Sequence, residues 1–480
     1  INFTGVKRTY SRLRLAGLAN QTLTVTTTDF TPAGATKVAT GSYTITADKK
    51  GNAYLYGVFA KGATVSVCNG NVEMESHTFT NATEERVSYA LDVPWPYLTF
   101  TASAEQTMTI KAYLDYSYDE SALDESMQYS VNGGEWAQLT AGEDITFGGD
   151  NGTLRLRGKS ANGTATSSSS RAEISFGDDN VQVACSGDIR TLVDYENYAT
   201  VSTANARFCF LFNGSTNLTS APELPATTLA DNCYRSMFYN CTNLTTAPEL
   251  PATTLTKDCY YEMFKGCTSL TAAHKLPATT LVNNCYYEMF SGCTSLTAAP
   301  ELPATTLAVN CYDLMFYNCT SLTVAPVLPA TTLAENCYYG MFNNCTSLTV
   351  APELPATTLA ESCYKSMFNG CTSLTAAPEL PATILAKLCY YQMFSGCTNL
   401  TAAPKLPATA LAISCYLEMF HGCTNLTAAP ELPATTLVNY CYEDMFYGCT
   451  NLSSITMLAT DISAYYCLKD WVSGVASSGT

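Results

Sequence analysis

Cysteines are the residues of this 480-residue sequence whose regular spacing could carry chemistry. Ten of them, from Cys233 to Cys467, follow one another at intervals of 26 residues. A second series, from Cys241 to Cys449, keeps the same interval eight residues later. Zinc sites are built from closer pairs of the form C-x2-4-C, and spacings of 8 and 18 residues supply none. The cysteine pattern therefore predicts no metal site.

Two interpretations of these cysteines remain open. In the first, they are small apolar side chains inside the protein, stacked as two columns of free thiols. In the second, disulfides join Cys233 to Cys241 within a repeat, or Cys241 to Cys259 across two repeats. If the segment is helical, residues eight apart lie ~12 Å from each other, whereas the Cα atoms of a disulfide are ~5.5–6 Å apart. This distance favours the free thiols.

Acidic side chains also recur once per repeat and form a candidate ligand-binding column. The residues at this position are Glu223, Glu249, Lys275, Glu301, Val327, Glu353, Glu379, Lys405 and Glu431. Strands of successive repeats would stack ~4.8 Å apart, so these side chains form a file in which like charges repel one another. We interpret the file either as a solvated face of mixed charge or as a polar docking strip, with room for a cation between Glu353 and Glu379.

A second candidate lies at a repeat position where the residue type varies, which indicates exposure to solvent. Tyrosine occupies this position in four repeats, as Tyr261, Tyr287, Tyr339 and Tyr391. Exposed tyrosines are rigid, amphipathic contact residues of the kind that binding surfaces favour. Because the chain has 31 tyrosines, the column is also compatible with tyrosines that bind nothing.

The sequence contains no constellation for catalysis. The three histidines, His77, His274 and His421, lie in unrelated contexts, and the H-E-x-x-H, G-x-S-x-G and P-loop motifs are absent. We therefore expect a protein that is not an enzyme, has no catalytic residues and needs no cofactor.

Charge and hydropathy argue against several kinds of partner. A net charge of −17 and a pI near 4.6 disfavour nucleic acids and anionic membrane surfaces, because both require clustered Lys and Arg. No run of ~18 apolar residues occurs, so we expect no insertion into a membrane. The sequence starts at Ile1 rather than Met, has few histidines and has strands rich in threonine and serine, from which we expect a processed, exported protein.

Both cysteine series belong to one 26-residue repeat, C-Y-x-x-M-F-x-x-C-T-[NS]-L-T-x-A-P-x-L-P-A-T-x-L-x-x-x. Its first apolar residues, such as Cys233, Met237 and Cys241, fall at i, i+4 and i+8 and predict about two turns of helix. The segment from Leu244 to Leu250 that follows reads as a short strand limited by prolines. A helical turn and a short strand per repeat, with leucines in fixed phase, are typical of a leucine-rich-repeat solenoid. We place this solenoid at 180–480, with a degenerate repeat capping each end.

Upstream of the repeats, apolar and polar residues alternate. Segments such as Tyr43 to Thr46 and Glu173 to Phe176 follow this alternation between turn signals, as half-buried strands do. Pro94-Trp95-Pro96 is a stiff break between two such regions. We predict two β-sandwich-like modules at residues 1–95 and 96–179. The expected fold class is therefore α+β and multidomain, with two β modules followed by a repeat solenoid.

The repeat resembles the BspA-type leucine-rich repeats of surface and secreted proteins from gut Bacteroidetes and some of their phages. Met289 to Thr297, M-F-S-G-C-T-S-L-T, are similar to that family's A-F-x-G-C-x-x-L-x pattern, with Met in place of Ala. The resemblance covers about 205–456 and departs from the family in its longer period and in its Pro-Ala-Thr-Thr-Leu link. Residues 129–136 and 154–158 resemble a module that often precedes such repeats, and residues 1–95 show no resemblance.

Members of this family are mostly adhesins or proteins of unknown ligand, so the resemblance implies binding but no particular target. As partner we expect a protein or glycan of a host or neighbouring cell. We therefore expect a cell-surface or secreted adhesion protein, with the solenoid as its binding surface. The two β modules would serve as a stalk or anchor and as a means of assembly. The alternative is a structural component of a virion or a surface filament, in which the β modules dock into the assembly.

Overall fold

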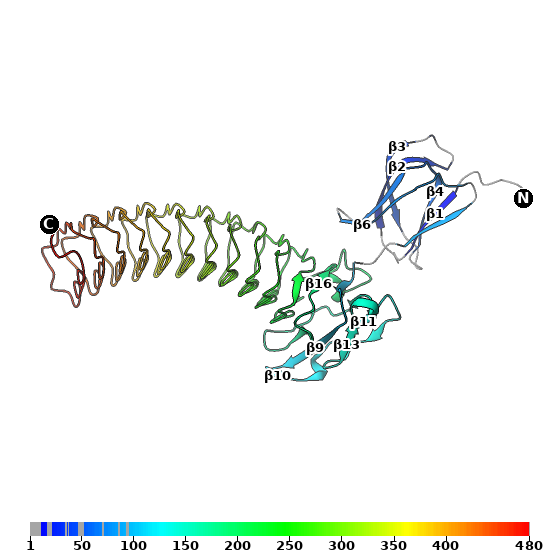
Figure 1. Cartoon of the computed structure of the whole chain (residues 1–480), viewed down its shortest axis with the longest axis horizontal. Helices are drawn as coiled ribbons and strands as arrows, with labels where there is room; N and C mark the ends of the chain where they lie inside the picture. Colours follow the sequence, from blue (N-terminus) through cyan, green and yellow to red (C-terminus); the bar gives the residue numbers. More distant parts are fainter. Residues whose placement is uncertain are drawn as a thin grey trace, which may run out of the picture. The chain divides into compact units, whose positions relative to one another are not determined.

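The computed structural model describes residues 11–16, 22–33, 36, 38–46, 52–69, 72–84, 87–92 and 96–479. The predicted break at Pro94-Trp95 lies outside the described residues. The chain divides into two compact units. One consists of Ile1–Tyr97 with Asp194–Val201, and the other of Leu98–Val193 with Ser202–Thr480 (Figure 1).

The first unit contains seven described strands. They are β1 (Ser11–Ala16), β2 (Thr22–Pro32), β3 (Val38–Thr46), β4 (Ala53–Phe59), β5 (Thr64–Asn69), β6 (Val72–Thr78) and β7 (Ser88–Asp92). They form a single sheet in the order β6-β5-β2-β4-β1-β7, with β3 paired to β2. In its core, Phe59 stacks on Phe30 and on Phe79, with ring centroids 4.4 and 4.6 Å apart. The region is β-rich as predicted, but its described strands form one continuous sheet.

The second unit begins with a β module of two sheets. Its strands are β8 (Leu98–Ala102), β9 (Gln106–Leu114), β10 (Ser117–Tyr118), β11 (Gln128–Val131), β12 (Ala137–Gln138), β13 (Asp144–Phe147), β14 (Leu154–Arg157), β15 (Arg171–Phe176) and β16 (Val183–Ser186), with 3-10 turns η1 (Glu120–Ala122), η2 (Gly149–Asn151) and η3 (Ile189–Leu192). Strands β10, β13 and β15 pair with β9 in one sheet, and the other has the order β12-β11-β14-β8-β16-β17. Phe100 of β8 contacts Phe176 of β15 edge to face at 5.5 Å, which joins the two sheets through a shared core.

The second sheet continues into the repeats. Strand β16 pairs with β8 on one side and with β17 (Leu218–Ser220), which belongs to the first repeat, on the other. The strands of this module therefore run past residue 179, where the sequence analysis placed its end. A change in composition marks the start of the repeats in the sequence, but the pairing of β16 with β17 joins the residues on either side of this point into one sheet.

This β module also closes the N-terminal end of the repeats. The Ile174 N–H donates to Leu211 O at 2.6 Å. The hydroxyl of Ser215, which stands in a slot of the second cysteine series, donates to Ile174 O at 2.9 Å. These bonds take the place of those that a preceding repeat would make. Repeat proteins need such a cap, because a terminal repeat otherwise exposes its interior and its unpaired backbone.

Each repeat forms one coil, and successive coils stack in register (Figure 1). The segment predicted to be helical is not a helix, since the structure has no α-helix in the residues that it describes. Instead, every fourth residue is left-handed, as at Asn232 (φ 60°), Ser236 (φ 50°) and Asn240 (φ 56°). A left-handed residue interrupts a right-handed helix, so the chain starts a new tight turn every four residues. This turn explains the apolar spacing of i, i+4 and i+8.

Backbone hydrogen bonds of this turn segment alternate in direction. The Tyr234 N–H donates to Cys259 O of the next coil at 2.8 Å, whereas the Arg235 N–H donates to Asn232 O of its own coil at 3.2 Å. An α-helix would instead join every residue i to i−4. The fold is therefore nearly all β-strand and turn, and the α component of the α+β prediction is wrong. Within the described ranges, no helix has the length and apolar character needed to cross a bilayer.

Aromatic columns fill the interior of the stack. Buried tyrosines from Tyr234 to Tyr442 and buried phenylalanines from Phe212 to Phe446 occur once per coil. Within each column, neighbouring rings are nearly parallel, with centroids 5.5–5.9 Å apart. This spacing corresponds to offset stacking, which adds a ring–ring attraction to the burial of the rings. Each coil therefore depends on its two neighbours for most of its apolar contacts.

All 22 cysteines are free thiols, and 21 of them are buried. The free-thiol interpretation agrees with this. The ~12 Å distance that favoured it does not apply, however, because the segment is not helical. In the second series the thiols have partners, and Cys267 Sγ donates to Phe238 O of the preceding coil at 3.1 Å. Burial raises the pKa of the thiols of the second series, for example that of Cys319 to about 12. They therefore remain protonated and are poor nucleophiles.

Candidate functional site

The four tyrosines singled out in the sequence lie in one half-buried column of the turn segments. Tyr261 and Tyr287 stack in adjacent coils, with ring centroids 4.6 Å apart. The guanidinium of Arg235, one coil earlier, lies 3.9 Å from the ring centroid of Tyr261. A cation over a ring is worth ~0.5–2 kcal/mol, depending on its solvation. The faces of Tyr261 are therefore occupied by side chains of the same protein.

Tyr339 and Tyr391 are held together by a cation between them. Lys365, in the intervening coil, places its ammonium 4.9 Å from the ring centroid of Tyr339 and 5.2 Å from that of Tyr391. Burial, followed by nearby carboxylates such as Glu418, raises the pKa of Tyr391, so this phenol stays protonated. The structure thus divides the predicted column into two pairs of tyrosines. One pair contacts Arg235 and the other contacts Lys365, and the sequence analysis had not placed either basic residue beside the tyrosines.

Asp313 stands between these two groups and is an unusual charge on the stack. Its side chain is almost fully buried, with 5 % exposure, and its Oδ1 has no hydrogen-bond partner among the described residues. Burial, and then the Glu288 carboxylate, raise the pKa of Asp313 to about 8, against the opposing effect of Lys365. At neutral pH this carboxyl is therefore mostly protonated.

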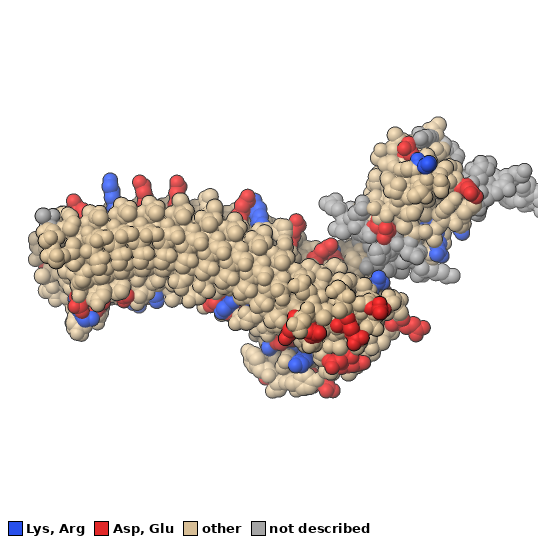
Figure 2. Space-filling view, viewed as in Figure 1, with Lys and Arg blue, Asp and Glu red and all other residues tan. Residues whose placement is uncertain are grey.

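The column of Glu and Lys side chains lies elsewhere on the coils. Figure 2 shows that the charged side chains of the stack follow its two long edges, while the broad face in view carries none. Neighbouring members of the column reach each other, as Lys275 Nζ and Glu301 Oε2 do at 2.9 Å. Glu353 and Glu379 line one shallow cavity of about 290 Å³, whose walls are prolines of two adjacent coils. The structure therefore brings the two predicted glutamates together.

This cavity combines two carboxylates with apolar proline walls. In the described residues, no group of three or more His, Cys, Asp or Glu side chains is placed to hold a metal ion. Two carboxylates between proline rings instead suit a basic side chain with an apolar stem. Similar cavities follow along the stack, where Lys405 shares one of about 410 Å³ with Glu379 and one of about 430 Å³ with Glu431. The proline walls recur because the prolines occupy the same positions in every one of these coils. The charged residues that line the cavities differ from one cavity to the next.

Three exposed valines lie in or beside this column, of which the sequence analysis named only Val327, as a member of the column. Val324 and Val350 occupy a position where most coils have Ala, and Val327 interrupts the charged column. They are 61 %, 70 % and 79 % exposed, respectively. An alignment of the repeats with one another contains the signal. Within two adjacent coils, valine replaces the usual alanine twice and the usual charged residue once.

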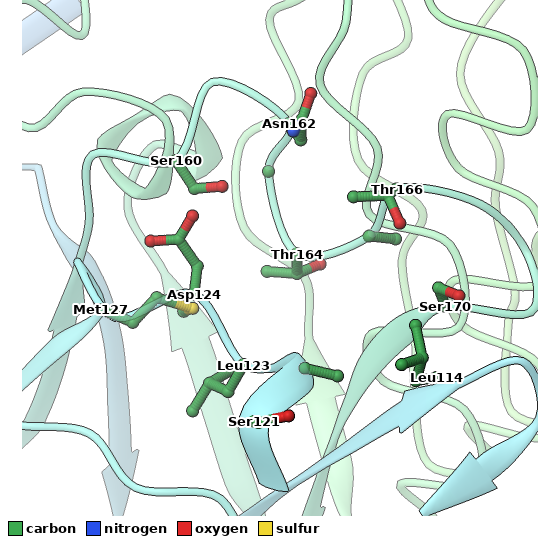
Figure 3. A pocket seen from close by; sticks show the side chains of 13 residues that line it. Leu114, Ser121, Leu123, Asp124, Met127, Ser160, Asn162, Thr164, Thr166 and Ser170 are labelled. Carbon is green, nitrogen blue, oxygen red and sulfur yellow. The ribbon is translucent and has the colours of Figure 1, made fainter. Parts of the chain in front are cut away.

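A separate pocket of about 260 Å³ lies in the β module, between the end of β9, η1 and the loop 160–170. Asp124 and Ser160 point toward each other on one side of it, and Thr166 and Ser170 lie on the other (Figure 3). Burial opposes the shift, but hydrogen bonds from Ser126 and Ser160 lower the pKa of Asp124. The pocket offers a carboxylate and hydroxyls for hydrogen bonding, and its carboxylate is already engaged by two serines.

The histidines lie in three separate environments. His421 stacks on Tyr447 with ring centroids 4.9 Å apart, and His77 contacts Phe79 edge to face at 4.8 Å. His274 is exposed at a position where other coils have proline. No hydrogen bond joins any of the three to another side chain of the described part of the chain.

Comparison with known proteins identifies the repeats. The profile of the family described as BspA type leucine rich repeat region matches residues 209–323 and 335–467, in six copies. The matched residues make up more than half of the chain and coincide with the stacked coils. No curated protein matches the chain. The chain belongs to the family of proteins with BspA-type leucine-rich repeats.

Proposed function

We propose that the chain is a non-enzymatic adhesion protein of the cell surface or extracellular space, which uses the side of its repeat stack to bind a protein or glycan. The observation that carries the proposal is the contrast between the inside and the outside of the coils. Inside, each complete coil places the same Cys, Tyr, Met and Phe types, which are fully buried. Outside, the charge and size of the residue change from coil to coil at fixed positions, without any change in the packing beneath.

Such variation gives a repetitive scaffold an individual surface. Repeat stacks offer extended surfaces of this kind to their partners, because exposed residues can change while the interior keeps the coils together. The resemblance of the repeats to those of surface adhesins supports the same function and location. The net charge of −17 supports a partner other than nucleic acid or anionic lipid.

We further propose different roles for the two β regions. The β module of residues 98–193 caps the first coil through hydrogen bonds such as that from Ile174 N–H to Leu211 O. The first unit is compact in its own right, with its own aromatic core. We propose that it attaches the protein to a surface or to an assembly and leaves the coils free for binding.

The test is an array of extracellular proteins and glycans probed with the full chain. We expect at least one ligand whose signal disappears when excess unlabelled chain is added, and no enrichment of nucleic acid. Removing glycans from a protein hit by enzymatic digestion distinguishes a protein contact from a glycan contact. Absence of any competed ligand, together with co-purification of the chain in intact virions or filaments, would contradict the proposal and favour a structural role.

A further inference from the structure

We infer that Val324, Val327 and Val350 (the valine patch), together with the cavity between Glu353 and Glu379 (the acidic cavity), bind a protein segment of defined chemistry. The segment carries a large apolar side chain close to an arginine or lysine. This inference rests on the proposed function and specifies both the part of the stack that is used and the class of partner.

The fold does not require the valine patch. Val324 pairs with Ala298 in a parallel bridge, and the same bridge is made further along by Ala376 and Ala402. Rings beneath these coils keep the same spacing, 5.7 Å between Phe316 and Phe342 and between Phe394 and Phe420. The preference of β-branched residues for extended backbone does not explain Val327, which makes no β-bridge among the described residues and stands in a column of charged residues.

The exposure of the valine patch points to a partner. Single exposed apolar residues are normal on a protein surface, but adjoining ones mark interaction sites. Here the three valines occupy two successive coils and are each more than 60 % exposed. Their apolar surface lies against water unless another molecule covers it, and covering it is favourable by ~25 cal/mol per Å².

The charge beside the valine patch identifies the partner's second feature. Glu353 follows Val350 by three residues in the same coil and is the next member of the charged column after Val327. No ion pair is recorded for Glu353 or Glu379 in the described residues, whereas Lys275 and Glu301 form one at the equivalent positions. Two neighbouring carboxylates repel each other, and a cation placed between them removes that repulsion. Charge complementarity therefore calls for a basic side chain.

Geometry limits the size of the segment. Val324 and Glu379 lie two coils apart, ~10 Å along the stack at the ~4.8 Å spacing of paired backbones, and three residues apart along the coil, which adds ~10 Å in the perpendicular direction. An extended peptide covers the resulting distance of ~14 Å in about four residues at ~3.3 Å each. One apolar and one basic side chain within a few residues of each other can therefore fill both parts of the site. Arginine suits the acidic cavity best, because its planar guanidinium binds carboxylates in pairs and packs on flat apolar walls.

Equivalent positions in different coils allow matched variants that test the site. V324A/V327A/V350A removes the apolar surface of the valine patch without changing charge, with the alanine that most coils carry at the positions of Val324 and Val350, and E353Q/E379Q removes the charge of the acidic cavity. E249Q/E431Q makes the same chemical change in coils away from the site and is the matched control. Thermal unfolding checks that all variants keep the fold of the full chain.

The probe is a displayed library of random peptides, selected on the full-length chain and resynthesised for titration. We expect enriched peptides to place Arg or Lys within a few residues of a large apolar residue. Their affinity should fall at least about tenfold in each site variant and remain unchanged in the control. Failure to enrich this pattern, or equal affinity for all variants, would overturn the inference.

Two further results would also overturn the inference. If sedimentation shows self-association that the valine-patch variant abolishes, the occupant is a second copy of this chain. If a ligand found on the arrays binds the valine-patch variant as well as the unaltered chain, the site is wrong although the proposed function stands. Complete absence of array ligands contradicts the proposed function instead, so the two failures are distinguishable.

Discussion

At the scale of single residues, the cysteines of the second series act as both apolar side chains and hydrogen-bond donors. Each is buried, and its thiol donates to the phenylalanine carbonyl of the coil before, as Cys293 Sγ does to Phe264 O at 3.1 Å. The same carbonyl accepts the Cys267 N–H of its own coil. Ser215, in the equivalent slot at the cap, makes its own bond to a carbonyl. The slot therefore selects a small side chain that can donate.

This role predicts an order of stability at Cys293. Replacement by serine keeps a donor for Phe264 O and should cost less than ~1 kcal/mol, whereas replacement by alanine loses both the bond and buried volume and should cost ~1–2 kcal/mol. Urea unfolding of the two variants under reducing conditions measures the difference. A serine variant less stable than the alanine variant would show that the slot is purely apolar.

Asp313 predicts a pH dependence of stability. Its pKa is about 8 in the folded protein and ~3.9 in an unfolded chain, so its contribution is most favourable below pH ~4 and is lost as the pH rises to about 8. D313N removes this loss. At pH 9 the variant should be more stable than the unaltered chain by at least ~1 kcal/mol, and the difference should shrink toward pH 4.

Denaturant unfolding at several pH values checks this expectation, with E431Q as the control because that glutamate is exposed. An equal effect of D313N at pH 4 and pH 9 would mean that Asp313 has the same pKa in the folded and the unfolded protein. Burial raises the pKa of Asp313 most, Glu288 raises it further and Lys365 lowers it, so substitution of Glu288 and of Lys365 should shift the transition in opposite directions.

At the scale of elements, the four-residue turn explains which residues a coil tolerates. Left-handed backbone recurs at three positions per coil, and at one of them the chain uses either glycine or asparagine, such as Gly292 (φ 74°) and Asn318 (φ 58°). A Cβ on Gly292 would approach nothing closer than 3.6 Å, so a substitution there tests backbone conformation with little steric conflict.

We predict that G292N is nearly neutral and that G292V destabilises the protein by ~1–2 kcal/mol or more. Asparagine enters the left-handed region readily, whereas a β-branched residue there is strained. Thermal unfolding of both variants measures the effect, and the asparagine variant serves as the matched control. Equal stability of the two would show that the coil changes its backbone at this position.

The same element shows how far the sequence was informative. The repeat and its interior residues were predictable, because Cys233, Met237 and Cys241 recur in every complete copy. The backbone was not, since apolar residues at i, i+4 and i+8 fit both an α-helix and turns of four residues over so short a segment. Asparagine and glycine mark one left-handed position, but Ser236 and its counterparts give no such signal.

The candidate sites were predictable in part for a related reason. The tyrosine column could be read from repeat alignment, but its pairing with Arg235 and Lys365 depends on the register of neighbouring coils. The proximity of Glu353 and Glu379 was predicted from the stacking, and the proline walls around them were not.

At the scale of the whole molecule, the repeats behave as a series of interdependent layers with a β module at one end. Each coil shares its aromatic stacking and its backbone hydrogen bonds with the coils on either side. Stability of such an array is a sum over coils and over the interfaces between them. The stability of the stack therefore depends more on whether each residue type falls at its own position in the coil than on the number of coils.

Deletions of different length test this account most directly, with labelling of thiols in the native protein as the measurement. Removing residues 390–415, one whole coil, should leave a shorter stack in which only Cys68, the one partly exposed cysteine, reacts. Removing residues 390–402, half a coil, should place strand positions against turn positions and make many buried cysteines reactive. Equal labelling of the two deletion variants, whether both remain protected or both become reactive, would contradict the stack of 26-residue coils.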